Sequence, residues 1–205
     1  MEVYIEGGGR KNKSLDIGLR RAFKGIFEKI LGEEVGKKIK PIASGGRGDA
    51  MNDYRKHCEK TSGIAFLLVD SENSEKSAEL EPFEQRKEFL KEIFPNEISD
   101  LREEKLKRIF FMVVNTESWL LTDKPRLQDF FGQGFKVDKL PQNLNYEKIS
   151  KKDIEEGFKT ATKDCKKKLT KAQVFDLLEK INTESLLKHG EEIKRFFEAI
   201  KKHAK

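Results

Sequence analysis

The sequence predicts an α/β fold with a mostly parallel sheet flanked by helices, followed by a helical C-terminal part. Short apolar runs alternate with helix-periodic segments over the first two thirds of the 205 residues. Two runs, 64–69 and 109–114, are continuously apolar, which is typical of parallel strands covered on both faces. The resulting β-α-β-α-β order requires crossover connections, and these are almost always right-handed.

The first elements follow one another closely. Val3–Ile5 is a short strand-like run that ends at three glycines, and apolar residues at helical spacing follow over 19–31. A weaker strand at 40–43 leads into a second glycine turn. We expect Asp49 to cap the next helix, because its side chain can accept a hydrogen bond from the first turn. The strand 64–69 comes after that helix.

The remaining elements are mostly helical. A strongly charged stretch contains a helix at about 83–94, and the strand 109–114 precedes a helix over 117–131 that is broken near Pro125. The last third predicts only helices, at about 151–165, 171–181 and 184–202. We expect one compact unit, with residues 1–140 as the α/β core and residues 141–205 as a helical extension packed on it.

Composition excludes several classes of protein. The longest apolar runs are far shorter than a membrane span, and no signal peptide is recognisable. Cys58 and Cys165 are the only cysteines and lack metal-ligand spacing, so a reducing, cytoplasmic setting is expected. The net charge of +6 is compatible with a nucleic-acid partner, although such an excess is as often functionally silent.

Three carboxylates follow strands of the predicted sheet. Glu6 comes directly after the first strand, and Asp70 and Glu72 come directly after the strand 64–69. The carboxyl ends of neighbouring parallel strands meet at one edge of a sheet, where ligands bind. If the extended backbone persists to residue 72, Asp70 and Glu72 point to the same side.

Converging carboxylates repel one another unless a cation neutralises them. Oxygen ligands of this kind suit Mg²⁺ or Mn²⁺, and such an ion can orient a phosphodiester and activate water. The alternative is that 70–74 is only a solvated polar turn.

The order of motifs resembles that of the Toprim domain of topoisomerases, primases and overcoming-lysogenization-defect nucleases. This resemblance implies a Toprim/Rossmann-like sheet. More closely, the chain resembles one bacterial Toprim-like family formerly described only as a domain of unknown function. The motifs that carry this resemblance extend over most of the chain: Ile5-Glu6-Gly7-Gly8-Gly9, Gly45-Gly46-Arg47, Leu67-Leu68-Val69-Asp70-Ser71-Glu72, Glu117-Ser118-Trp119-Leu120-Leu121-Thr122-Asp123 and Phe130-Phe131-Gly132-Gln133-Gly134-Phe135.

The resemblance implies a metal-dependent nuclease that acts in prokaryotic anti-phage defence beside an ABC-type ATPase, as in two-gene abortive-infection systems. It implies that Glu6 is a metal-proximal acid or general acid/base and that Asp70 and Glu72 are metal ligands. The broad Toprim signature is Asp-x-Asp, whereas this chain has Asp70-x-Glu72, so the longer side chain is expected to shift the ion.

Further charged residues are candidates for the same site. Glu117 follows the strand 109–114 and either completes a second metal site or only begins a helix, where a carboxylate is favoured. Arg10, Lys11 and Arg47 lie in predicted loops near the carboxylates, where they either hold phosphate or are simply solvated. Trp119 is expected to be a core residue.

A basic stretch lies in the C-terminal part. Lys163, Lys167 and Lys171 belong to it and either follow a nucleic-acid backbone or form a solvated face. Lys171 also resembles a lysine of the family, which implies that it stabilises the charge on the reacting phosphate. No Gly-Lys-Ser/Thr follows the glycine clusters, so the chain is not expected to hydrolyse ATP by itself.

Three functions remain open from the sequence. The leading one is the nuclease, acting on DNA or RNA under control of the ATPase. The second is a catalytically silent Toprim scaffold or sensor in the same complex. The third is a phosphohydrolase of small nucleotides, which would need a closed pocket with base-recognition groups. A homo-oligomer is compatible with each.

Overall fold

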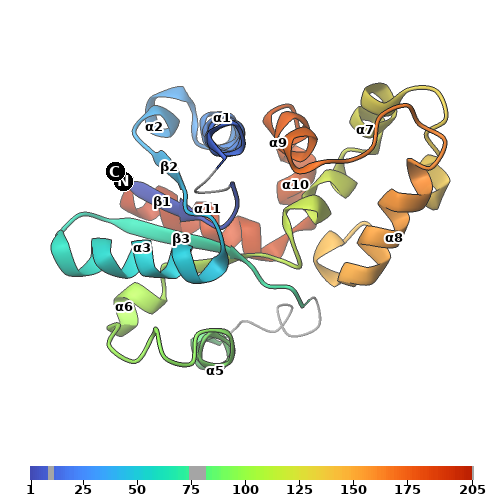
Figure 1. The fold of residues 1–205 in the computed structure, drawn as a ribbon. Coiled ribbons are helices and arrows are strands. Elements are labelled where there is room, and N and C mark those ends of the chain that lie inside the picture. The colour runs from blue at the N-terminus through green and yellow to red at the C-terminus, as the bar shows by residue number, and fades with distance from the viewer. Residues whose placement is uncertain (9–11, 74–81, 205) are drawn as a thin grey trace.

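The computed structural model describes residues 1–8, 12–73 and 82–204 and contains a four-stranded parallel sheet (Figure 1). The strand order is β2-β1-β3-β4. The strands are β1 (Glu2–Ile5), β2 (Lys40–Ala43), β3 (Ala65–Asp70) and β4 (Ile109–Met112). The sheet is flanked by helices, so the predicted α/β class with a mostly parallel, Toprim/Rossmann-like sheet is confirmed.

Two layers of helices cover the sheet. On one face lie α3 (Arg47–Lys60) and, below it in Figure 1, α5 (Phe83–Ile93) and α6 (Glu103–Leu106). On the other face lie α1 (Lys13–Leu31) and α11 (Glu191–His203). The remaining helices and 3₁₀ turns are α2 (Glu33–Lys37), η1 (Thr116–Thr122), α7 (Lys124–Phe131), η2 (Val137–Lys139), η3 (Tyr146–Lys148), α8 (Lys151–Ala161), α9 (Lys171–Glu179) and α10 (Thr183–His189).

Aromatic side chains join the layers. Phe196 of α11 packs on Phe66 of β3 and Phe110 of β4, with ring centroids 6.2 and 5.5 Å away. Trp119 is buried, as predicted, and its ring centroid lies 5.8 Å from that of Phe23 in α1. Every residue of β3 is buried, which agrees with a central strand covered on both faces.

Several predicted boundaries differ from the structure. Helix α3 begins at Arg47 with Gly46 as its N-cap, so Asp49 lies in the first turn and does not cap the helix. Strand β4 ends at Met112, because Val114 has a positive φ of 66° that extended backbone does not allow. The predicted break near Pro125 is confirmed and falls at Asp123, whose side chain caps α7.

The C-terminal helices spread along the molecule. α9 packs on α1, and α11 runs along the sheet, whereas α8 lies at the right-hand end in Figure 1. The predicted helix 184–202 is two helices, α10 and α11, separated at Gly190. In the described parts of the chain, no helix has the length and apolar character needed to cross a membrane.

Candidate active site

Glu6 and Asp70 are joined directly at the carboxyl edge of the sheet. Strands β1 and β3 are neighbours, and the ladder continues one step beyond β1 because the Glu6 N–H donates to the Leu68 carbonyl at 2.9 Å. The Glu6 Oε2 atom in turn accepts the backbone N–H of Asp70 at 3.0 Å. This bond holds the Glu6 carboxylate over the end of β3, as the positions of the two residues after neighbouring strands predicted.

Asp70 is the most buried carboxylate of the site, with 8% of its surface exposed. Its Oδ1 atom accepts a hydrogen bond from the Thr116 hydroxyl at 3.4 Å. Burial raises the pKa of Asp70 well above its usual value, the charges of Glu6, Glu117 and Glu72 add to this increase, and Lys171 opposes it. The ionised form of the Asp70 carboxyl group is therefore unfavourable unless a cation lies nearby.

Glu72 reaches the site by a different route from the one predicted. Its φ of 62° takes it out of the extended conformation, so alternation along a strand does not place its side chain beside Asp70. The turn is fixed by two hydrogen bonds, from the Glu72 N–H to the Val114 carbonyl at 2.9 Å and from the Val114 N–H to the Ser71 hydroxyl at 2.8 Å. The β3–β4 connection therefore directs the Glu72 carboxylate toward α3 and α8, where its ion-pair partners lie.

Arg47 connects two of the carboxylates. As the first residue of α3, it lies with Nε 3.6 Å from Glu6 Oε2 and with Nη2 3.6 Å from Glu72 Oε1. Burial raises the pKa of Glu6, and the Arg47 guanidinium and the Asp70 N–H counteract only part of that increase. Glu6 is thus suited to exchange a proton at a higher pH than an exposed glutamate.

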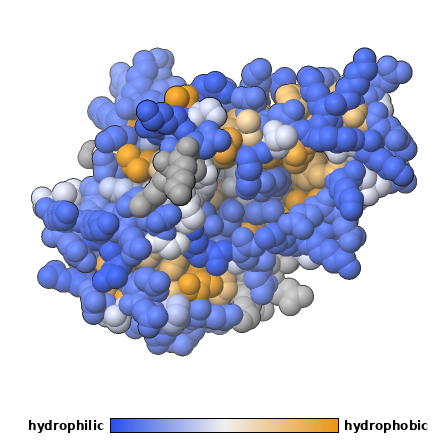
Figure 2. Space-filling view, in the orientation of Figure 1, coloured by the Kyte–Doolittle hydropathy of each residue, from blue (hydrophilic) through white to orange (hydrophobic). Residues whose placement is uncertain are grey.

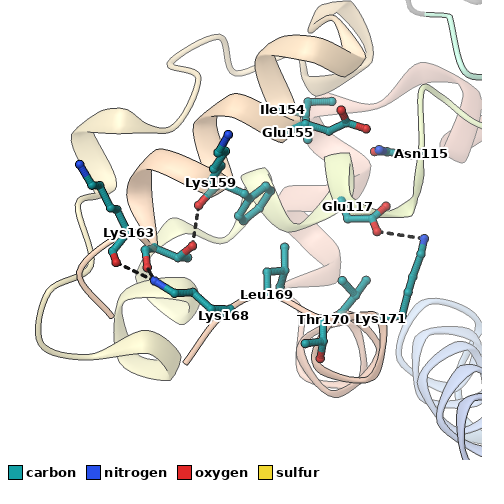
Figure 3. Close-up of a pocket in the computed structure, with 13 residues that line it drawn as sticks. Asn115, Glu117, Ile154, Glu155, Lys159, Lys163, Lys168, Leu169, Thr170 and Lys171 are labelled. Atoms are coloured by element: carbon teal, nitrogen blue, oxygen red, sulfur yellow. Dashed lines mark hydrogen bonds and ion pairs between the residues drawn. The ribbon is translucent and has the colours of Figure 1, made fainter. Parts of the chain in front are cut away.

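Glu117 and Lys171, the first residue of α9, form the side of the site nearest to α8. Glu117 lies in the first turn of η1, and its Oε1 is 3.0 Å from the Lys171 Nζ (Figure 3). The other carboxylate oxygen, Oε2, is buried and has no hydrogen-bond partner in the described structure. Partial burial acts to lower the pKa of Lys171, but the charges of Glu117, Asp70 and Glu6 raise it overall. Both predicted roles of Glu117, helix start and site residue, are compatible with this position.

Lys151 and Thr116 belong to the site but were missed by sequence reasoning. Lys151 is the first residue of α8 and forms an ion pair with Glu72, which raises the pKa of the lysine. The two residues are 79 positions apart, and a lysine beginning a helix carries no signal for such a contact. Thr116 does stand beside Glu117 in the sequence, so a search of the segment after β4 for donors would have found it.

The other predicted phosphate-binding residues are dispersed. Lys163 lines the same pocket as Glu117 and Lys171 but lies on the opposite side of it (Figure 3). Lys167 lies over the Phe130 ring, 4.7 Å from its centroid, and donates to the Phe130 carbonyl at 3.3 Å. Arg10 and Lys11 lie outside the described residues.

The oxygen-only donor set fits a hard divalent cation in its chemistry. The buried, unpartnered Glu117 Oε2 is one position where such an ion would satisfy an otherwise unmet polar atom. As they are placed, however, no three acidic, histidine or cysteine side chains among the described residues form a metal-binding group. Instead, Arg47 bridges Glu6 and Glu72, Lys151 pairs with Glu72 and Lys171 pairs with Glu117.

The chain belongs to the family described as a domain of unknown function (DUF4276), whose pattern matches residues 10–201. No curated protein and no solved structure matches the chain. The family description names no activity.

Proposed function

We propose that this protein is a Mg²⁺- or Mn²⁺-dependent nuclease of the Toprim type, which cleaves phosphodiester bonds in DNA or RNA. The observation that supports it best is the meeting of Glu6, Asp70 and Glu72 at one sheet edge, linked by the Asp70 N–H and by Arg47. The net charge of +6 is in keeping with a polyanionic substrate.

Each residue has a distinct part in the proposed reaction. Asp70, Glu72 and Glu117 would hold the metal with Glu6 beside them, and the ion would supply a Lewis acid and an activated water. Glu6, with its raised pKa, would take the proton from the attacking water or return one to the leaving oxygen. Arg47 and Lys171 would bind the phosphate oxygens, where negative charge grows as the P–O bond breaks.

The biological setting is part of the proposal and rests on the resemblance to the Toprim-like defence family. In that setting the nuclease is a cytoplasmic effector of anti-phage defence, and an ABC-type ATPase encoded beside it controls its activity.

The alternative is a catalytically silent Toprim scaffold in the same complex. One observation favours it: Glu72 and Glu117 are paired with Lys151 and Lys171. Cations of the chain itself can therefore neutralise the acidic cluster, as is expected of a site that has lost its metal.

The deciding experiment is expression in cells with and without the candidate ATPase, comparing wild type with Asp70→Ala/Glu72→Ala. The nuclease predicts growth arrest and fragmentation of DNA or RNA that the double variant abolishes. A matched control, Asp129→Ala/Glu184→Ala, removes two exposed carboxylates elsewhere and is expected to behave as wild type.

Purified protein gives a second test of the chemistry. Glu6→Gln is expected to lower Mn²⁺-dependent cleavage about 100-fold or more, as for loss of a general acid or base.

If cells expressing the wild type and the Asp70→Ala/Glu72→Ala variant are equally protected against phage, catalysis is excluded and the scaffold is correct.

A further inference from the structure

A pocket of about 570 Å³ adjoins the acidic site, between α8 and α9 (Figure 3). Figure 2 shows apolar surface in the hollow between these helices, surrounded by hydrophilic residues. Pockets of this size accept a ligand as large as one nucleotide. The pocket could not be predicted from the sequence, because its walls come from three separate segments around residues 115–117, 154–163 and 168–174.

The inner wall of the pocket is apolar. Ile154, Phe158 and Val174 line it, although each is at most 5% exposed, and Leu169 adds a partly buried side chain. These residues belong to the packed interior, so the wall is preformed and does not have to collapse around a ligand. An aromatic ring and aliphatic side chains are the surface on which a nucleobase stacks.

The rim of the pocket carries several lysines beside the carboxylate of Glu155. Lys159 and Lys163 line it, and the side-chain amine of neither forms a hydrogen bond or ion pair with another residue that the structure describes. Lys168 has a structural role instead, since its Nζ donates to the Thr162 and Lys163 carbonyls at 2.7 and 2.6 Å. Lys159 and Lys163 thus offer unengaged ammonium groups at the end of the pocket opposite Glu117, which suits a ligand with a flat base and anionic oxygens.

The pocket and the acidic site share two side chains. Glu117 and Lys171 line the pocket and also form the ion pair at the edge of the acidic site. In Figure 3 they lie on one side of the pocket, while Lys159 and Lys163 lie on the other. A ligand that fills the pocket therefore extends to the place where the proposed reaction occurs.

We propose that this pocket binds one unpaired nucleotide of the nucleic-acid strand that the acidic site cleaves. The base lies against Phe158 and Leu169, a neighbouring phosphate contacts Lys159 and Lys163, and the next phosphodiester reaches Lys171. The inference deepens the proposed nuclease function and rests on it for the identity of the strand as a substrate. It assigns the substrate class as nucleic acid with unpaired bases, because a base stacked inside a duplex cannot enter a pocket.

The test is fluorescence anisotropy in the presence of a metal chelator, with a labelled single strand of about ten nucleotides and the same sequence as a duplex. The single strand is expected to bind about tenfold more tightly than the duplex. Two variants test the two parts of the pocket: Lys159→Glu/Lys163→Glu tests the rim, and Leu169→Ser tests the apolar wall. Each is expected to weaken single-strand binding about tenfold.

A control separates the pocket from general charge. Lys56→Glu/Lys60→Glu makes the same change of charge on the exposed surface of α3 and is expected to leave binding within about twofold of wild type. Equal losses in the two charge variants would overturn the pocket and leave only non-specific attraction. Competition by pyrophosphate as strong as competition by a mononucleotide would also overturn it, because the apolar wall would then contribute nothing.

The source of the nucleotide is tested in the same assay. A mononucleotide that binds as tightly as the single strand would overturn the strand assignment and make a free nucleotide the ligand. Because metal and cleavage are absent from the assay, the two proposals fail separately. Pocket-dependent binding without any nuclease activity would reject the nuclease alone, whereas nuclease activity with unaltered binding in both pocket variants would reject the pocket alone.

Discussion

Asp70 illustrates how one residue couples stability to function. It is a buried carboxylate near three others, Glu6, Glu72 and Glu117. Its pKa in the folded protein is raised above the value of an exposed aspartate, so between these two pKa values the folded chain holds a proton that the unfolded chain has released. The contribution to stability is therefore greatest below this window and is lost as the pH rises through it.

The first prediction is that Asp70→Asn stabilises the metal-free protein at neutral pH. The free energy of unfolding is expected to increase, because the neutral amide removes the cost of keeping a carboxylate charge buried beside other carboxylates. Urea denaturation between pH 4 and pH 8, with a chelator present, measures the difference from wild type, which should increase with pH. Asp129→Asn, at an exposed position, should leave that difference near zero, and an Asp70→Asn protein less stable than wild type at neutral pH would contradict the prediction.

Residues of the site differ in how far the sequence could predict them. Glu6 and Asp70 follow strands, and the parallel order of the sheet is enough to bring such residues together. Glu72 was assigned to the site for a partly wrong reason, because the turn at φ 62° and not strand alternation sets its direction. Lys151 could not be predicted, since its contact depends on where α8 lies in space.

At the scale of elements, a buried ion pair fixes α11 to α5 and β4. Arg86 donates to both carboxylate oxygens of Glu192 at 2.7 Å, and one of these oxygens also accepts the Phe111 N–H at 3.2 Å. Arg86 donates further to the Ile109 carbonyl at 3.0 Å. The side chains are 4% and 1% exposed, so removal of Glu192 leaves the buried Arg86 guanidinium without its two-oxygen carboxylate partner.

The second prediction is that Glu192→Gln lowers the free energy of unfolding by about 3–5 kcal/mol. The double variant Arg86→Met/Glu192→Leu is expected to recover much of this loss, since it removes both charges at similar volume. Chemical denaturation at pH 7 measures both. The surface pair Lys194–Glu191 provides the control: Glu191→Gln should cost less than about 1 kcal/mol. Equal losses for Glu191→Gln and Glu192→Gln would show that the burial of the pair is irrelevant.

The third prediction concerns the division between α10 and α11. A Cβ atom at Gly190 would lie 2.0 Å from the hydroxyl oxygen of the buried Tyr146. Gly190→Ala is therefore expected to destabilise the protein by about 1–3 kcal/mol, and by less in a Tyr146→Phe background. At Gly48 in α3, a Cβ meets nothing within 4 Å, so Gly48→Ala should be neutral or stabilising by up to about 1 kcal/mol. Thermal unfolding compares the variants, and a harmless Gly190→Ala would disprove the steric explanation.

The elements themselves were predictable where local pattern and burial agree. The four strands and α1 were evident because their apolar residues recur with the period of the element that forms. The separation of 184–202 at Gly190 was not predicted, because local periodicity does not reveal the close packing of Gly190 on Tyr146, 44 residues earlier in the chain. The pocket was also unpredictable, because helical periodicity does not say how α8 lies relative to α9.

At the scale of the whole molecule, the acidic site is balanced by cations from distant elements. Arg47 comes from α3, Lys151 from α8 and Lys171 from α9, and together they contact Glu6, Glu72 and Glu117. A divalent ion at the site has to compete with these groups. Lys151 is the one most easily displaced, since both it and Glu72 are about two-fifths exposed.

The last prediction is that Lys151→Met increases the affinity for Mn²⁺. Loss of one positive charge close to a metal-binding carboxylate removes a repulsion of about 1 kcal/mol in a solvated setting, which corresponds to roughly fivefold in the dissociation constant. Isothermal titration with Mn²⁺ measures the change, which should shrink at high salt. The neighbouring Lys152→Met is the matched control, because Lys152 is exposed and forms no ion pair within the described chain.

Weaker Mn²⁺ binding in Lys151→Met would mean that the lysine supports the metal site, and no binding in any of the three proteins would favour the silent scaffold. Tighter binding would mean that metal and Lys151 exclude each other at Glu72, so that loading the ion also releases the first residue of α8, the helix that forms one wall of the nucleotide pocket.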